Sequence, residues 1–212
     1  MSHPQAKRVV ETLQKIYAEK GMVDMGNPEH TLIATLLSAR TTDVQVLKVY
    51  PGLRTVFPRL LDLAQAKESE IAKLISSIGL YRNKAKAIKA LARMLLEEFD
   101  GEVPKTLDEL VRLPGVGRKT ASCVLWYGYG IPAMAVDTHV FRIAHRLGWA
   151  KGKTAEQVER ELMEAIPRSL WGEVNRTFVQ FGRDVCKPST PQCWRCPVAK
   201  WCQFSPKTEK LS

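Results

Sequence analysis

Between two segments with helical periodicity, the chain reads Leu113-Pro114-Gly115-Val116-Gly117-Arg118-Lys119-Thr120-Ala121. Pro114 ends the first helix, and the two glycines allow tight, left-handed turns that other residues rarely adopt. The second helix then begins with free backbone N–H groups and a positive dipole end, which together attract an anion. The sequence predicts a helix–turn–helix corner, held to the core by Leu113 and Val116, that either only turns the chain or also binds a phosphate.

The lysine in this stretch occupies an unusual position, because the helix dipole repels a cation from the first turn. The same repulsion, together with partial burial, would lower the pKa of Lys119 and populate its neutral amine. A neutral amine is a nucleophile that can form a Schiff base with a sugar aldehyde. Lys119 is therefore a candidate nucleophile, and the alternative is a surface lysine that contacts a phosphate.

Further along, the chain reads Val136-Asp137-Thr138-His139-Val140-Phe141 and continues as an apolar-periodic helix. This pattern predicts Asp137 as the N-cap of that helix. A carboxylate that accepts helix N–H bonds is held ionised and fixed in orientation. Asp137 can thus be a plain cap and also stabilise a positive charge that develops beside it.

A cluster of cysteines lies near the C-terminal end, at Cys186, Cys193, Cys196 and Cys202. Four thiolates suit either zinc or an iron–sulfur cluster. Zinc sites usually pair two short Cys-x2-4-Cys knuckles, and here only Cys193 and Cys196 form one. This asymmetry favours a cubane cluster, with zinc as the main alternative and four unligated core cysteines as the third. Because no secretory signal precedes them, a disulfide framework is not expected.

The composition indicates a globular protein with a polyanionic partner. The 212 residues are 45% hydrophobic and carry a net charge of +10, without a basic tail. The clearest basic run places Arg82, Lys86, Lys89 and Arg93 on one face of a helix, which a solvated surface explains equally well. No apolar run approaches the ~20 residues of a membrane helix, so we expect no membrane partner and a cytoplasmic location, associated with the nucleoid in a prokaryote.

Helical periodicity recurs along the chain and strand signals are nearly absent, which predicts an all-α fold of two helical lobes. A buried helix is expected over residues 30–39, and a helix through Val46 and Tyr50 that Pro51-Gly52 interrupts. Residues 154–157 form a capping box that starts another helix. A first amphipathic helix, which Gly21 ends, is expected to bury Val9, Leu13, Ile16 and Tyr17.

Taken together, residues 113–121, residues 136–139 and the cysteine loop resemble the endonuclease III family of base-excision DNA glycosylases, in the helix–hairpin–helix superfamily. The resemblance covers nearly the whole chain, to Cys202, and the order and spacing of the three motifs make it specific. It implies a bifunctional DNA glycosylase and abasic-site lyase that removes oxidised or damaged pyrimidines from duplex DNA, as a monomer.

The resemblance also assigns roles to residues. It implies that Lys119 attacks C1′ of the damaged nucleoside and, through a Schiff base, permits β-elimination of the 3′ phosphate. It makes Asp137 the carboxylate that helps to activate Lys119 and stabilises positive charge on the sugar. The cysteine cluster is implied to bind a [4Fe–4S] cluster. The implied contacts to the DNA are Gly115, Val116, Gly117, Arg118 and His139.

The resemblance further implies the domain organisation. Residues 21–133 are expected to form a six-helix barrel with the helix–hairpin–helix. Residues 1–20 and 134–212 are expected to form an N/C-terminal helical domain with the cluster loop. A cleft between the two lobes would receive the flipped lesion, because a base inside the stack cannot be reached.

The chain departs from the family pattern at Arg40, where bacterial relatives usually have glutamine in the loop that fills the gap left by the flipped base. Arg40 can still occupy that gap, with a different contact to the orphan base. Leu80 matches a position that often acts as an apolar wedge, and the alternative is packing in the core. The loop from Cys186 to Cys193 has one basic residue, Lys187, where relatives often carry more positive charge.

Three alternatives to the bifunctional enzyme remain open from the sequence. A monofunctional mismatch glycosylase of the same superfamily would typically lack a lysine at position 119. A non-enzymatic iron–sulfur DNA-binding protein would need neither Lys119 nor Asp137. A zinc-stapled DNA-binding module would be colourless, whereas an iron–sulfur protein is brown.

Overall fold

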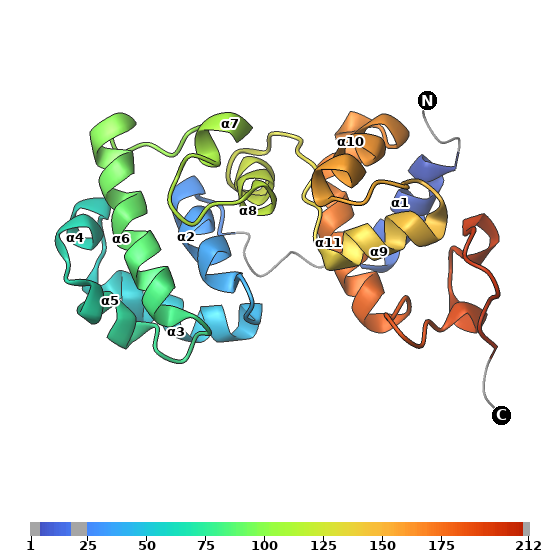
Figure 1. The fold of residues 1–212 in the computed structure, drawn as a ribbon, viewed down its shortest axis with the longest axis horizontal. Helices are drawn as coiled ribbons and strands as arrows, with labels where there is room; N and C mark the ends of the chain where they lie inside the picture. The colour runs from blue at the N-terminus through green and yellow to red at the C-terminus, as the bar shows by residue number, and fades with distance from the viewer. Residues whose placement is uncertain (1–4, 18–24, 210–212) are drawn as a thin grey trace. The chain divides into compact units, whose positions relative to one another are not determined.

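The structure is a computed structural model that describes residues 5–17 and 25–209 (Figure 1). The chain divides into two compact units, Gly21–Ile131 and Met1–Lys20 with Pro132–Ser212. Throughout the described residues, all regular secondary structure is helical, so the all-α prediction is confirmed. None of the helices within these residues has the length and apolar character needed to cross a membrane.

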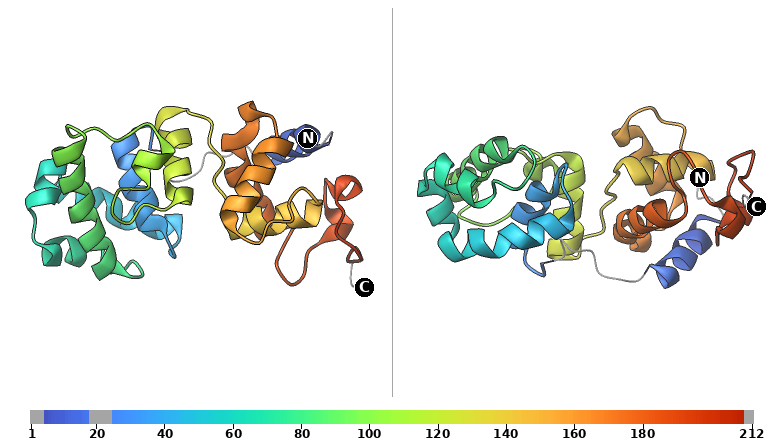
Figure 2. Two further views of the ribbon diagram at one scale, coloured as in Figure 1. Left: turned by 45° about the horizontal axis from the view of Figure 1, so that its top comes forward. Right: turned by 90° about the horizontal axis from the view of Figure 1, so that it is seen from below.

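The unit Gly21–Ile131 is built around one buried helix. Its elements are α2 (Pro28–Ser38), α3 (Asp43–Val56), α4 (Leu60–Gln65), α5 (Glu68–Leu74), α6 (Tyr81–Glu98), α7 (Leu107–Leu110), α8 (Arg118–Cys123) and the π-helical turn η1 (Val124–Gly128). Helix α2 contacts α3, α6, α8 and η1, and its residues from Thr31 to Leu37 are all buried. The expectation of a buried helix here is confirmed, because α2 packs against several elements of its own unit (Figure 2).

Helix α3 runs through the proline that was expected to interrupt it. It continues from Asp43 to Val56 with Pro51 inside, so that part of the prediction is wrong. A proline in a helix leaves the carbonyl of the residue four positions earlier without its donor. Here that residue is Leu47, which is exposed, so water can satisfy its carbonyl. Tyr50 and Leu53 are buried on either side of Pro51, and their packing holds the helix together.

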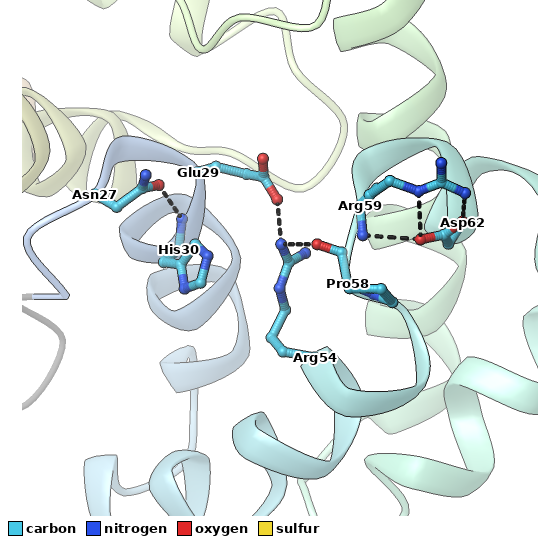
Figure 3. A network of polar contacts seen from close by, with 7 residues as sticks. All are labelled: Asn27, Glu29, His30, Arg54, Pro58, Arg59 and Asp62. Carbon is cyan, nitrogen blue, oxygen red and sulfur yellow. Dashed lines mark hydrogen bonds and ion pairs between the residues drawn. The ribbon is translucent and has the colours of Figure 1, made fainter.

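A polar network joins the start of α2 to the end of α3 (Figure 3). The guanidinium of Arg54 lies 2.7 Å from the carboxylate of Glu29 and donates to the backbone oxygen of Pro58 at 2.6 Å. Beyond Pro58, Asp62 accepts from the backbone N–H of Arg59 at 2.9 Å and so caps α4. The network therefore fixes the corner that leads from α3 into α4.

The second unit packs around helix α11. Its elements are α1 (Ala6–Ile16), α9 (Thr138–Leu147), α10 (Ala155–Ala165), η2 (Arg168–Leu170), α11 (Trp171–Asp184), η3 (Cys193–Arg195) and η4 (Ala199–Trp201). Helix α11 contacts both α1 and α9, and its Phe178 and Phe181 are among the largest fully buried side chains. The capping box expected at Thr154 is present, with Gln157 bonding back to the backbone N–H of Thr154.

The buried face of α1 differs from the one predicted. Val9 and Leu13 are buried as expected, but the face is completed by Ala6 and Val10, and Ile16 is 53% exposed. Because the face is centred between Val9 and Val10, Ile16 lies at its edge in the last turn. The expected stop at Gly21 lies outside the described residues.

Candidate functional site

The turn between α7 and α8 has the predicted form. The backbone N–H of Val116 donates to the oxygen of Leu113 at 3.1 Å and closes the turn. Both side chains are buried, Leu113 at 2% and Val116 at 6% exposure, so they anchor the turn in the core. The turn then delivers the chain into α8 at Arg118.

The two glycines of this turn serve different purposes. Gly115 has a φ of +79°, and a Cβ added there would lie 2.9 Å from Cβ of Ala87 and 3.2 Å from Cδ1 of Leu36. It therefore needs glycine for both conformation and space. Gly117 has a φ of −93°, so only Gly115 of the two adopts the left-handed conformation that both glycines allow. No atom lies within 4 Å of where its Cβ would be, which leaves open space at the start of α8.

Lys119 lies in the first turn of α8, as the sequence predicts. Its side chain and that of Arg118 are half-buried. One turn later, Cys123 is buried at 1% exposure, which agrees with its expected place in the core. Helix α8 passes directly into the π-helical turn η1, a distortion that is frequent at functional sites.

Asp137 is the N-cap of α9, as predicted. Its Oδ1 accepts hydrogen bonds from the backbone N–H groups of His139 at 2.9 Å and Val140 at 2.8 Å. The other carboxylate oxygen, Oδ2, takes part in neither of these bonds. The chain leading to Asp137 is held by Asn175 of α11, which is buried and donates from Nδ2 to the oxygen of Ala135 at 3.0 Å. Asn175 was missed from the sequence, where the only signal was an amide inside an apolar helical pattern.

His139 is held against α11. A Cβ on Gly182 would lie 2.5 Å from Nδ1 of His139, so a glycine is needed there. Burial lowers the pKa of His139; Asp137 opposes this shift, and Arg142 and Arg183 add to it. Nη2 of Arg142 lies 3.2 Å from the same Nδ1. A neutral His139 whose Nδ1 accepts from Arg142 carries its proton on Nε2, where it can donate to an anion.

The four cysteines line one apolar hollow, although they come from different turns of the chain. The same hollow is lined by Ile143, Leu147, Phe181 and Val198. Burial raises the pKa of the Cys196 thiol to about 11, and the other cysteines add to the shift. A bound cation would favour the thiolate form of Cys196. The donor set and the apolar walls fit a metal cluster.

Arginine side chains of α9, which sequence reasoning missed, surround this hollow. Nη1 of Arg146 donates to Sγ of Cys186 at 3.2 Å and to the oxygen of Lys187 at 2.7 Å. Nη2 of Arg142 donates to the oxygen of Cys186 at 3.0 Å. The two arginines lie one helical turn apart, and that spacing was the available signal. Among the residues that the structure describes, no three His, Cys, Asp or Glu side chains come close enough to hold a single metal ion.

Arg40 and Leu80 come together in the unit Gly21–Ile131. The backbone oxygen of Arg40 lies 3.4 Å from where a Cβ on Gly79 would be, so the loop after α2 touches the residue before Leu80. The side chain of Arg40 is exposed, and that of Leu80 is 53% exposed. Core packing, the alternative for Leu80, is therefore excluded. Lys119 and the hairpin lie in the same unit, whereas Asp137, His139 and the cysteines lie in the other.

Comparisons with protein families and with known proteins all lead to the same group of proteins. Residues 33–168 match the family described as HhH-GPD superfamily base excision DNA repair protein. Endonuclease III of Thermotoga maritima is 46% identical over 178 residues, which cover 84% of this chain and 84% of the relative. Endonuclease III of Bacillus subtilis is 43% identical and covers 87% of this chain and 84% of its own length.

Solved structures agree with the sequence relatives. A trapped covalent intermediate of an endonuclease III with DNA is 40% identical, with a TM-score of 0.85 and coverage of 92% of both chains. A thermostable thymine-DNA glycosylase is 26% identical, with a TM-score of 0.79, and covers 93% of this chain and 94% of its own. The fold and the motifs therefore lead to the same group of proteins.

Proposed function

Because the chain belongs to the endonuclease III family within the HhH-GPD superfamily of base excision DNA repair proteins, we propose that it removes damaged pyrimidines from DNA. It is a DNA glycosylase and lyase, as its relatives are. We propose that its substrate is duplex DNA with an oxidised or otherwise damaged pyrimidine and that it acts as a monomer. The single observation that carries this proposal is Lys119 in the first turn of α8, two residues after the open position at Gly117.

In the proposed reaction, Lys119 is the nucleophile. Its neutral amine attacks C1′ of the damaged nucleoside, the C1′–N bond breaks, and the base leaves with the electron pair. The lysine nitrogen then loses a proton and the C1′–O4′ bond breaks, with a proton going to O4′, so that the sugar ring opens to a Schiff base. The Schiff base acidifies the proton on C2′, whose loss breaks the C3′–O bond and releases the 3′ phosphate. The relative trapped as a covalent intermediate with DNA supports this assignment.

Asp137 is proposed to act on the same nucleotide through charge. A carboxylate fixed by two backbone hydrogen bonds pays little reorganisation cost when positive charge develops on the sugar. The oxygen outside the cap, Oδ2, is the one that we propose to stabilise that charge. This role requires that Lys119 and Asp137, which lie in different units, reach one nucleotide.

The DNA backbone is proposed to bind at the hairpin. At Gly115, Gly117 and Arg118, backbone N–H groups and a guanidinium can meet phosphate oxygens without reading the base sequence. Val116, whose own N–H closes the turn on Leu113, is proposed to hold these groups in place. The ring N–H of His139 can add a further phosphate contact. We further propose that residues 21–133 act as a six-helix barrel and that residues 1–20 and 134–212 act as the cluster domain.

Cys186, Cys193, Cys196 and Cys202 are proposed to hold a [4Fe–4S] cluster. Each iron of a cubane takes one thiolate, so the four sulfurs stand farther apart than around a single zinc ion, whose ligands all lie about 2.3 Å from one point. Four thiols around one apolar hollow support a bound metal cluster, and the spacing of the cysteines along the chain favours the cubane. When bound, the cluster supplies a cross-link that orders the loop. Iron and zinc analysis of the purified protein tests the choice.

Borohydride trapping tests the proposed function. Duplexes carrying thymine glycol, dihydrouracil, uracil or an abasic site are incubated with enzyme and reductant. We expect a covalent adduct with the first two and with the abasic site, and none with uracil. Lys119→Gln should abolish the adduct while lesion binding persists, and Lys67→Gln, an exposed lysine on the same unit, is the matched control. Base release without any adduct would instead indicate a monofunctional glycosylase.

A further inference from the structure

Arg40 and Leu80 share an uncommon backbone conformation. Arg40 has a φ of +56° and Leu80 a φ of +61°, and neither is a glycine. A left-handed conformation is unfavourable for a residue that carries a Cβ. Such strain persists only where the surroundings hold it, and it concentrates at functional sites. Both side chains are exposed, so burial of these side chains does not hold it.

Lys84 provides the restraint. It lies one turn into α6 from Leu80, and its side chain is buried, with 6% exposure of the residue. Its Nζ donates to the oxygen of Leu37 at 2.9 Å and to the oxygen of Ala39 at 2.6 Å. Both oxygens are at the C-terminal end of α2, where carbonyls lack helical partners and the dipole favours a cation.

Lys84 is also connected, through its own backbone, to the turn that carries Leu80. The N–H of Lys84 donates to the oxygen of Leu80 at 3.0 Å and so closes the first turn of α6. Nε2 of Gln45 makes another connection, to the oxygen of Ser77 at 3.4 Å. Lys84 therefore joins the residue before Arg40 to the turn that carries Leu80.

This placement is costly for a lysine. Burial lowers the pKa of Lys84, and in the described part of the chain its amine meets backbone carbonyls and no carboxylate. A methionine would fill the same space without the cost of removing an amine from water. The benefit that a lysine brings is the pair of hydrogen bonds that hold the end of α2.

We propose that Lys84 is a positioning residue that holds Arg40 and Leu80 together as one two-pronged element for insertion into the duplex. The inference rests on the proposed function, in which Arg40 fills the gap left by the flipped base and Leu80 is the wedge. Lys84 touches neither the base nor the sugar in this scheme. It acts by keeping the two exposed side chains at a constant separation.

The test compares two substrates for Lys84→Met. To cleave at an abasic site in duplex DNA, the enzyme must first insert into the double helix and displace the nucleotide from the stack. Cleavage of a single-stranded abasic oligonucleotide does not require this insertion. We expect duplex cleavage by the variant to fall on the order of 10- to 100-fold, the usual cost of misplacing a positioning group. Single-strand cleavage should stay within about twofold, because Lys119 is untouched. Lys48→Met, an exposed lysine on α3, is the matched control and should leave both rates unchanged.

A double-mutant cycle separates positioning from a general structural role. If Lys84 acts through Arg40 and Leu80, its replacement should have no further effect once both side chains are removed. Adding Lys84→Met to an Arg40→Ala, Leu80→Ala protein should then leave the rate of duplex cleavage unchanged. Additive losses would overturn the inference. Gln45→Ala removes the exposed hydrogen bond to the oxygen of Ser77. It should lower the ratio of the duplex cleavage rate to the single-strand cleavage rate by a smaller factor than Lys84→Met does. This variant carries the test if Lys84→Met does not fold, and an unchanged ratio there would count against the proposal.

Failure of the proposed function and failure of the role of Lys84 give different results in this experiment. If the wild-type protein cleaves neither substrate, the proposed function itself falls, and this inference falls with it. If the wild-type protein cleaves both and Lys84→Met keeps the wild-type ratio, only the role of Lys84 is overturned.

Discussion

Replacing each of the two hairpin glycines by alanine should have opposite effects. The change at Gly115 should lower the stability of the protein, and the change at Gly117 should not. At Gly115 the new Cβ would meet Cβ of Ala87 at 2.9 Å, and that atom is fixed to the backbone of α6. The left-handed φ of +79° costs about 1–2 kcal/mol and overpacking about 1–3 kcal/mol, so Gly115→Ala should destabilise its unit by about 2–5 kcal/mol. At about 2–4 °C per kcal/mol, the melting temperature should fall by about 4–20 °C.

Gly117→Ala should leave the fold intact. The φ of −93° suits alanine, and no atom lies within 4 Å of the new Cβ. Stability should stay the same or rise by about 0.4–1 kcal/mol, because the unfolded chain loses freedom. The methyl group would, however, occupy the space that the proposed phosphate contact requires. Loss of a hydrogen bond to a charged group costs about 1.5–3 kcal/mol, so binding should weaken about 10- to 100-fold.

The assay measures both quantities for both variants. Differential scanning calorimetry reports the melting transitions. Fluorescence anisotropy at constant salt concentration reports the affinity for a duplex carrying a non-cleavable abasic analogue. A Gly115→Ala protein that melts with the wild type would show that the contact with Ala87 is relieved without cost. A Gly117→Ala protein that binds DNA as tightly as the wild type would refute the phosphate contact at this turn.

The remaining predictions concern charge, metal and base reading. Asp137→Asn keeps the cap, since asparagine caps as well as aspartate, but lowers the single-turnover excision rate by about 10²–10⁴-fold through loss of charge; near-normal turnover would leave Asp137 a structural cap. Cys193→Ala should yield colourless protein, with the absorbance near 400 nm (roughly) lost and the cluster unit destabilised in calorimetry; a colourless but fully active protein would make the metal dispensable. Arg40→Gln should remove a preference for lesions opposite guanine worth about 1–3 kcal/mol, measured as excision with each of the four opposite bases; identical profiles would make Arg40 a phosphate contact.

Local features of the fold follow from the sequence because their causes lie within a few residues. The cap at Asp137 and the capping box at Thr154 need only a side chain and the N–H groups of the next turn. The left-handed Gly115 is likewise a property of its own backbone, and the order of the motifs was enough to indicate the family. The cysteine spacing predicted a common ligand site, and the four side chains do line one hollow.

Only the tertiary structure decided the features that depend on residues far apart in the chain. Pro51 stays inside α3 because Tyr50 and Leu53 pack on distant neighbours, which outweighs the local break. Leu80 is 53% exposed although its side chain is apolar, and it precedes α6 in a left-handed conformation. Lys84 lies within a basic stretch of the sequence, and only the packing of α2 against α6 places its amine on the carbonyls of Leu37 and Ala39. The burial of a side chain and its contacts with backbone carbonyls depend on how separate helices pack together. Helical periodicity along the sequence therefore does not predict them.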